Sequence, residues 1–238
     1  MLLGIVLLYV GAVLCINGIW LIGQASAAEA AEVAPDRESA PDVSASVGGR
    51  GRQAGAPDRE SAPDVSASVG GRGRQAALAR AEASPLYIEN REVTVINLFT
   101  GFVGVVVAVT YIVQGNAHSD LASARSGGFI LLFAFTYLWV TINQWLNAGG
   151  RGFGWYCLFV AITAVPAGIY TLNHAAGNTG SVWLGLNWFV WAILWFMFFV
   201  LLALGRPIAR ITGLFTVFVG IATSWILGFG VLIGSWHF

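Results

Sequence analysis

The sequence predicts an all-α polytopic membrane protein with six transmembrane helices and a long disordered loop between the first two. Three observations support this fold class. Of the 238 residues, 57% are hydrophobic and only 10% are charged, and the mean hydropathy is +0.73. Six apolar runs are long enough to cross a hydrocarbon core of about 30 Å. The charges are segregated, since 19 of the 24 charged residues lie between Glu29 and Glu92.

Residues 1–23 are predicted to form the first transmembrane helix, because residues 2–23 are apolar and carry no charge. A secretory signal peptide is the alternative, since Ala25-Ser26-Ala27 resembles a small-residue cleavage site. The run lacks a basic amino-terminal region, however, and is longer than the hydrophobic region of a usual signal peptide. A retained membrane helix is therefore the favoured interpretation.

Two features of this first span predict helix contacts. Gly4, Gly11 and Gly18 recur every seven residues and give one face a smooth strip suited to close packing. Asn17 places a polar side chain at membrane depth, where it needs a partner. That partner is either a neighbouring helix or water in a pore.

Residues 24–92 are predicted to form a disordered loop. The segment is rich in small, polar and charged residues, and residues 35–54 are repeated identically as residues 57–76. Each copy has too few apolar residues to offset the entropy lost on ordering. The repeat therefore does not predict a solenoid of stacked units.

Residues 93–238 are predicted to hold transmembrane helices 2–6. Their apolar runs are 93–114, 128–146, 154–173, 182–204 and 209–234. The loops after spans 1, 3 and 5 carry 11 arginines, and those after spans 2 and 4 carry one, Arg125. The positive-inside rule makes the first set cytoplasmic. Both termini are then expected outside, and the long 24–92 loop in the cytoplasm.

The spans lack the side chains that several function classes require. No Asp, Glu, Arg or His lies well inside any span, which disfavours ion pumps, proton-coupled transporters and charged ion filters. The three histidines lack ligand spacing, so no metal site is predicted. No catalytic set or phosphate-binding loop is present, so neither an enzyme nor a cofactor is expected. The zero net charge indicates no nucleic-acid partner.

An aromatic stripe on the fifth span is the most informative pattern. Trp188, Trp191 and Trp195 fall at i, i+3 and i+7, within an arc of about 60° on a helix. This stripe is either core packing or one wall of a narrow pore. A pore lined by flat aromatic faces and neutral hydrogen-bonding groups would exclude ions. It would still admit a small, flat, neutral molecule such as an amide.

Several segments together resemble the bacterial urea channel and amide transporter family, the UreI/AmiS type. The resemblance covers all six spans in order, over about residues 1–23 and 93–235. It rests on Gly4–Gly11, Asn17-Gly18-Ile19, Phe135–Leu138, Ile142-Asn143, Trp155-Tyr156, Leu158–Ile162, Val165-Pro166-Ala167 and the pattern Trp188, Trp191, Leu194, Trp195.

The resemblance implies a twisted six-helix bundle around a pore within each protomer, assembled as a homo-hexamer in the bacterial cytoplasmic membrane. It implies passive permeation of urea or short aliphatic amides, which would feed a cytoplasmic urease or amidase. Asn17 and Asn143 are candidates for polar pore or helix-contact positions. The constriction residues of the family correspond here to Val10, Leu14, Phe135, Trp139, Trp188, Trp191, Leu194 and Trp195.

Departures from the urea channels favour the amide-transporter branch. Trp139 stands where the urea channels carry tyrosine, and Val219 stands where they carry glutamate. The outer loops, 115–127 and 174–181, are short and carry one histidine each. A proton-gated urea channel is the first alternative. A second is a membrane scaffold without transport activity that recruits a cytoplasmic partner through the 24–92 loop.

Overall fold

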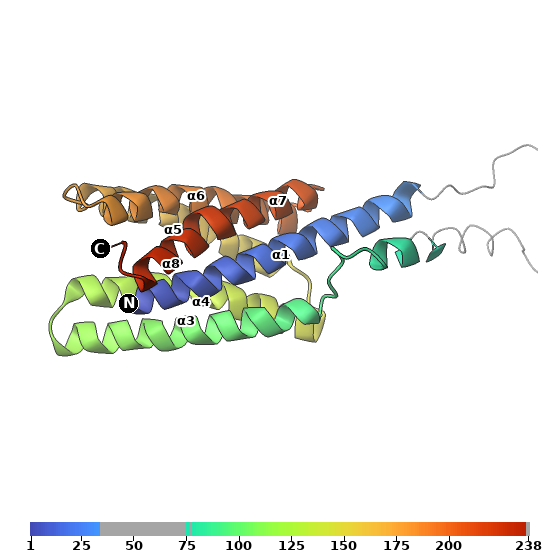
Figure 1. The fold of residues 1–238 in the computed structure, drawn as a ribbon. Coiled ribbons are helices and arrows are strands. Elements are labelled where there is room, and N and C mark those ends of the chain that lie inside the picture. Colours follow the sequence, from blue (N-terminus) through green and yellow to red (C-terminus); the bar gives the residue numbers. More distant parts are fainter. Residues whose placement is uncertain (34–74, 77, 237–238) are drawn as a thin grey trace, which may run out of the picture. The chain divides into compact units, whose positions relative to one another are not determined.

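The computed structural model describes residues 1–33, 75–76 and 78–236. It separates into two compact units, Met1–Ala25 with Pro85–Phe238, and Ser26–Ser84. The described residues form helices, turns and connections, without strands. The helices are α1 (Leu2–Val33), α3 (Glu92–Ala117), α4 (Leu121–Leu146), α5 (Arg151–Asn173), α6 (Thr179–Leu202), α7 (Ala209–Val219), the π-helical segment η1 (Gly220–Trp225) and α8 (Ile226–Leu232) (Figure 1).

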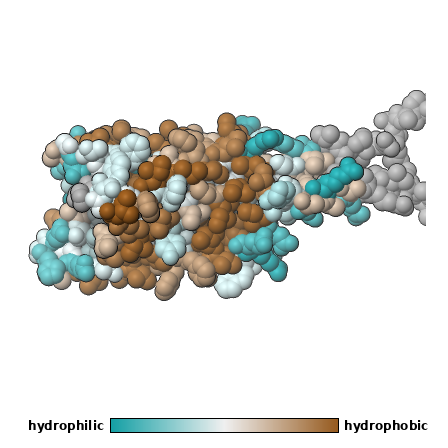
Figure 2. Space-filling model, in the orientation of Figure 1, coloured by the Kyte–Doolittle hydropathy of each residue, from teal (hydrophilic) through white to brown (hydrophobic). Residues whose placement is uncertain are grey.

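The predicted fold class is confirmed. In the described part of the chain, six helices are long and apolar enough to cross a membrane, with α7, η1 and α8 forming one continuous span from Ala209 to Leu232. Many large apolar side chains on these helices are exposed, as expected of surfaces that contact lipid. On the face shown in Figure 2, hydrophobic residues gather in a region bordered by hydrophilic residues.

The first helix extends beyond the predicted boundary at residue 23. Helix α1 continues ten residues past position 23, to Val33, because the segment after Gln24 is rich in alanine, the strongest helix former. The structure also describes residues 85–91, at the end of the predicted loop, in contact with α1. Gln24 Nε2 donates to the Ile88 carbonyl at 3.1 Å, and Trp20 Nε1 donates to Asn90 Oδ1 at 3.0 Å. Residues 34–74, which hold the first repeat and most of the second, lie outside the described residues.

Helices α3 and α4 form one antiparallel pair, and α5 and α6 form another (Figure 1). Capping side chains define where two of these helices begin. Asp120 accepts from the Ala122 and Ser123 amides at the start of α4, and Asn178 accepts from the Ser181 amide at the start of α6. Asn147, in the left-handed conformation with φ 49°, ends α4. These short connections keep the helices of each pair adjacent.

The glycine strip of α1 makes a close helix contact, as the sequence predicted, and its partner is the last span. A Cβ atom on Gly11 would lie 2.8 Å from the backbone nitrogen of Trp225, and one on Gly18 would lie 2.6 Å from the Gly213 carbonyl oxygen. One on Gly4 would lie 2.9 Å from the Val231 side chain. The backbones therefore approach more closely than any larger residue would allow.

Candidate functional site

A cavity of about 470 Å³ lies among α1, α4, α5 and α6. It is much larger than the roughly 30 Å³ that one water molecule occupies. Aliphatic side chains of α1 form one side, including Val10 and Leu14, and aromatic rings of α4 and α6 form the others. The cavity therefore has an apolar lining with few hydrogen-bonding groups, as small-molecule sites in proteins commonly have.

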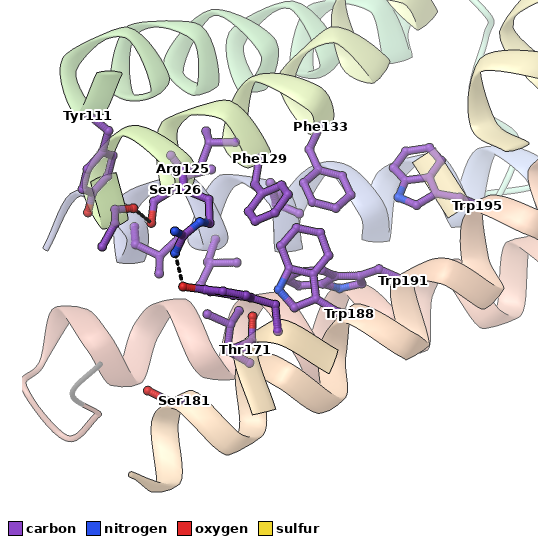
Figure 3. A pocket seen from close by; sticks show the side chains of 18 of the residues that line it. Tyr111, Arg125, Ser126, Phe129, Phe133, Thr171, Ser181, Trp188, Trp191 and Trp195 are labelled. Carbon is purple, nitrogen blue, oxygen red and sulfur yellow. Dashed lines mark hydrogen bonds between the residues drawn. The ribbon is translucent and has the colours of Figure 1, made fainter. Parts of the chain in front are cut away.

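Phe133 is the ring on which the aromatic wall converges. Its centroid lies 5.3 Å from that of Trp188, 5.4 Å from that of Trp191 and 6.1 Å from that of Trp195. One turn earlier, Phe129 meets Trp188 edge-on at 4.9 Å. Figure 3 shows these two rings extending from α4 toward the tryptophans of α6. The cavity is thus bounded by facing aromatic groups from two helices.

One end of this cavity is polar. Arg125 of α4, labelled in Figure 3, donates a hydrogen bond to the Tyr170 hydroxyl of α5. Its Cζ lies 4.2 Å from the centre of the Tyr170 ring. His174 stacks on the same ring at 4.0 Å. Among the described residues that line the cavity, Arg125 alone carries a permanent charge. A cation at this mouth repels other cations and leaves neutral solutes unaffected.

A second cavity, of about 180 Å³, lies toward the opposite end of the bundle. Its lining includes Asn17 on α1 and Asn143 and Gln144 near the end of α4. The two cavities share three lining residues, Leu14, Tyr137 and Trp195. These three side chains therefore lie where the two spaces adjoin.

Most of the predicted site residues line these cavities. The first cavity is lined by Val10, Leu14, Trp188, Trp191, Leu194 and Trp195. The second is lined by Leu14, Trp195 and the two predicted polar residues, Asn17 and Asn143. Asn17 is also a helix contact, because its amide pairs with that of Asn97 on α3.

Phe135 and Trp139, also predicted as constriction residues, line neither of these two cavities. Phe135 is 44% exposed, and Trp139 is 37% exposed and stacks on Tyr156 at 5.3 Å on the flank of α5. Residues two apart on a helix point about 200° apart. The aromatic residues of α4 that line the large cavity are Phe129, Phe133 and Tyr137.

Those three residues were missed by sequence reasoning because α4 has two aromatic faces with the same spacing. They recur every four residues, as Phe135 and Trp139 do, so two aromatic faces of α4 were equally periodic. Ser126 precedes Phe129 by one turn and also lines the cavity.

The linings of the two cavities are dominated by uncharged side chains. Among the described residues, no group of three or more His, Cys, Asp or Glu side chains could hold a metal ion. Val219, named above as a departure from the urea channels, is a fully buried apolar residue. Along the two cavities, the groups available to a solute are ring faces and neutral hydrogen-bonding side chains.

A family model described as AmiS/UreI family transporter matches residues 84–235. The chain belongs to the AmiS/UreI family. It is 36% identical over 151 residues to a protein of Mycolicibacterium smegmatis described as a putative amidate substrates transporter, covering 63% of this chain and 68% of that protein. It is 31% identical over 175 residues to the acid-activated urea channel of Helicobacter pylori, covering 63% and 88%.

The fold of this AmiS/UreI member also matches a solved structure. The crystal structure of the Helicobacter pylori urea channel superimposes with a TM-score of 0.65 at 25% sequence identity, covering 100% of both chains. The relatives described above are transporters or channels. The family predicted from the sequence motifs is therefore confirmed, together with the six-helix membrane architecture.

Proposed function

We propose that this protein is a channel-like passive transporter of small neutral amides, short aliphatic amides or urea, through each protomer. The observation that carries the proposal is the pair of cavities that follow one another along the bundle and share Leu14, Tyr137 and Trp195. A solute entering beside Arg125 would pass the rings of α4 and α6 and leave beside Asn143.

The lining explains why a neutral solute is favoured over an ion. Between Arg125 at one mouth and the amides of Asn143 and Gln144 at the other, the described lining carries no carboxylate. An ion would lose hydration there without a compensating charge, at a cost of many kcal/mol. A planar amide gives up few hydrogen bonds and gains contact with ring faces. Selection therefore comes from size, flatness and neutrality.

The membrane, orientation and assembly belong to the same proposal. The arginines of the short loops, Arg151, Arg206 and Arg210, favour a cytoplasmic position for the Asn143 mouth. The Arg125 mouth and both termini then face outward across the bacterial inner membrane. A homo-hexamer, suggested by the family resemblance, would bury part of the apolar surface. A cytoplasmic amidase or urease would consume the solute.

Stopped-flow light scattering of proteoliposomes tests the function. Vesicles containing the protein should recover volume faster than empty vesicles in acetamide and in urea, at both pH 7 and pH 5. Rates equal to those of empty vesicles for both solutes at both pH values would refute transport.

A proton-gated urea channel is the alternative that the match to the Helicobacter pylori channel favours. The side chains at the proposed outer mouth are His174, Tyr170 and Arg125. Under this alternative, urea permeability rises sharply between pH 7 and pH 5, and acetamide permeability stays low.

A scaffold role is favoured by the duplicated segment at residues 35–54 and 57–76. Deleting residues 35–76 distinguishes the scaffold role from the transport function. Under the transport proposal, the deletion leaves solute permeability per reconstituted protein unchanged. Under the scaffold alternative, it removes a cytoplasmic partner that the full chain recovers, and the full chain transports nothing.

A further inference from the structure

The last span contains a π-helical turn whose extra residue is visible in the glycine spacing. Gly4, Gly11 and Gly18 of α1 are seven residues apart, whereas the glycines that face them on the last span, Gly213, Gly220 and Gly228, are seven and then eight apart. The longer interval, Gly220 to Gly228, contains η1. A π-helical turn holds one residue more than an α-helical turn, so it keeps the two strips in register. The facing pairs are Gly18 with Gly213, Gly11 with Gly220, and Gly4 with Gly228.

The π-helical turn places Thr223 opposite the aromatic wall. The Trp191 indole Nε1 donates to the Thr223 hydroxyl oxygen at 2.8 Å, and that hydroxyl donates to the Val219 carbonyl at 2.7 Å. Asn187 Nδ2 donates to the Thr223 carbonyl at 3.1 Å. All three side chains are buried, with at most 7% of each exposed.

The direction of these bonds is set by chemistry. A threonine hydroxyl has one hydrogen and two lone pairs, and an indole nitrogen only donates. Because the Thr223 hydrogen is directed to Val219, a lone pair is available to Trp191. A π-helical turn also shifts the backbone bonding pattern, and Asn187 bonds a carbonyl within it. Two residues of α6 are thus tied to one residue of η1.

We propose that Thr223 is a positioning residue that fixes the orientation of Trp191 and thereby sets the size of neutral solute that the cavity admits. This inference rests on the proposed transport function. Trp191 lines the large cavity and meets Phe133 and Trp188. Without its acceptor, the indole gains other orientations, and the wall at this level becomes wider and less uniform.

The test compares Thr223→Val, which removes the hydroxyl at similar volume, with Thr223→Ser, which keeps it. In proteoliposomes, Thr223→Val should raise the ratio of butyramide to acetamide permeability by about two- to tenfold, the range expected for loss of one hydrogen bond. Thr223→Ser should retain the wild-type ratio. Equal ratios for wild type and Thr223→Val, or an equal rise in Thr223→Ser, would overturn the inference.

Thr216→Val is a matched control. Thr216 is also buried in the last span and donates to the carbonyl four residues earlier, at 2.6 Å. No hydrogen bond joins it to an indole among the bonds of the described residues. Its substitution removes a comparable hydroxyl and should leave the permeability ratio unchanged. A rise equal to that of Thr223→Val would assign the effect to general loosening of the span and refute positioning.

Nitrogen-15 NMR of the tryptophan indoles gives a readout independent of transport. The Trp191 resonance is identified by its loss in Trp191→Phe, and it should shift in Thr223→Val and stay in place in Thr223→Ser. An unshifted resonance in Thr223→Val refutes the contact. If Thr223→Val does not fold, Trp191→Phe, which removes the donor, should raise the same permeability ratio, and an unchanged ratio overturns the inference. Absence of wild-type transport would instead refute the proposed function.

Discussion

The side-chain amides of Asn17 on α1 and Asn97 on α3 are hydrogen bonded to each other in both directions. Asn17 Nδ2 donates to Asn97 Oδ1 at 3.1 Å, and Asn97 Nδ2 donates to Asn17 Oδ1 at 2.7 Å. Asn97 also donates to the Val93 carbonyl. Both side chains are buried, so the pair joins two helices at membrane depth without exposing a polar group to lipid.

Asn97→Ala should therefore destabilise the bundle by on the order of 1 kcal/mol, because it leaves the Asn17 amide without its partner. The measurement is the thermal unfolding midpoint of the purified protein in detergent. Asn17→Leu/Asn97→Leu should be less destabilising than the sum of the single leucine substitutions. Additive effects would show that the two amides do not stabilise each other.

Phe133→Ala and Phe135→Ala form a matched pair of substitutions on α4. Phe133 touches all three cavity tryptophans, and Phe135 is 44% exposed on the other face. Phe133→Ala should change the butyramide to acetamide permeability ratio severalfold, since it removes the ring at the centre of the wall. Phe135→Ala should leave the ratio at the wild-type value. The reverse result would place the solute path on the Phe135 face.

This pair also shows what a single sequence can indicate about such a site. The arc formed by Trp188, Trp191 and Trp195 follows from helical spacing, and all three line the cavity. For α4, spacing could not separate the two aromatic faces. Lipid and an apolar cavity both favour hydrophobic side chains, so polarity does not distinguish the face that meets one from the face that meets the other.

The π-helical turn could not be predicted from the sequence for a different reason. The apolar run at 209–234 predicts a span but not its type of helix, and η1 departs from a regular α-helix by one residue. In the sequence, the extra residue shows only as the eight-residue interval from Gly220 to Gly228. That interval is informative only when it is compared with the seven-residue spacing of the α1 glycines that face it. The sequence also could not identify the partner of Asn17, because spacing along one chain does not show which helix lies next to α1.

Gly11→Ala should destabilise the contact between α1 and the last span. The added Cβ would lie 2.8 Å from the Trp225 backbone nitrogen, which cannot move without shifting the helix. We expect a loss of about 1–3 kcal/mol, the range for overpacking. Gly128→Ala is the control, since a Cβ there meets nothing within 4 Å. Equal thermal midpoints for the two variants would contradict close packing at Gly11.

The amino-terminal cap of α4 predicts a pH dependence. The hydrogen bonds from the Ser123 hydroxyl and backbone amide hold the pKa of the Asp120 carboxyl below its usual value. Its stabilising contribution is therefore present near neutral pH, begins to decline as pH falls through the usual aspartate range near about 4, and is lost below the lowered pKa.

Asp120→Asn isolates this effect, because asparagine also caps helices and does not titrate. The difference in thermal midpoint between wild type and Asp120→Asn should favour wild type at pH 7 and diminish as the pH is lowered toward 3. A difference that stays constant across this range would show that the Asp120 charge does not contribute to the cap.

The central claim is that the solute crosses the cavity between α4 and α6. Thr171 lines this cavity, and Asn173, two residues later on α5, does not. In a Cys15→Ala/Cys157→Ala background, Thr171→Cys and Asn173→Cys can each be labelled with a bulky thiol reagent, with labelling verified by mass spectrometry. Labelled Thr171→Cys should lower acetamide permeability toward that of empty vesicles, and labelled Asn173→Cys should leave it unchanged. Full permeability in vesicles with labelled Thr171→Cys would contradict the proposed path.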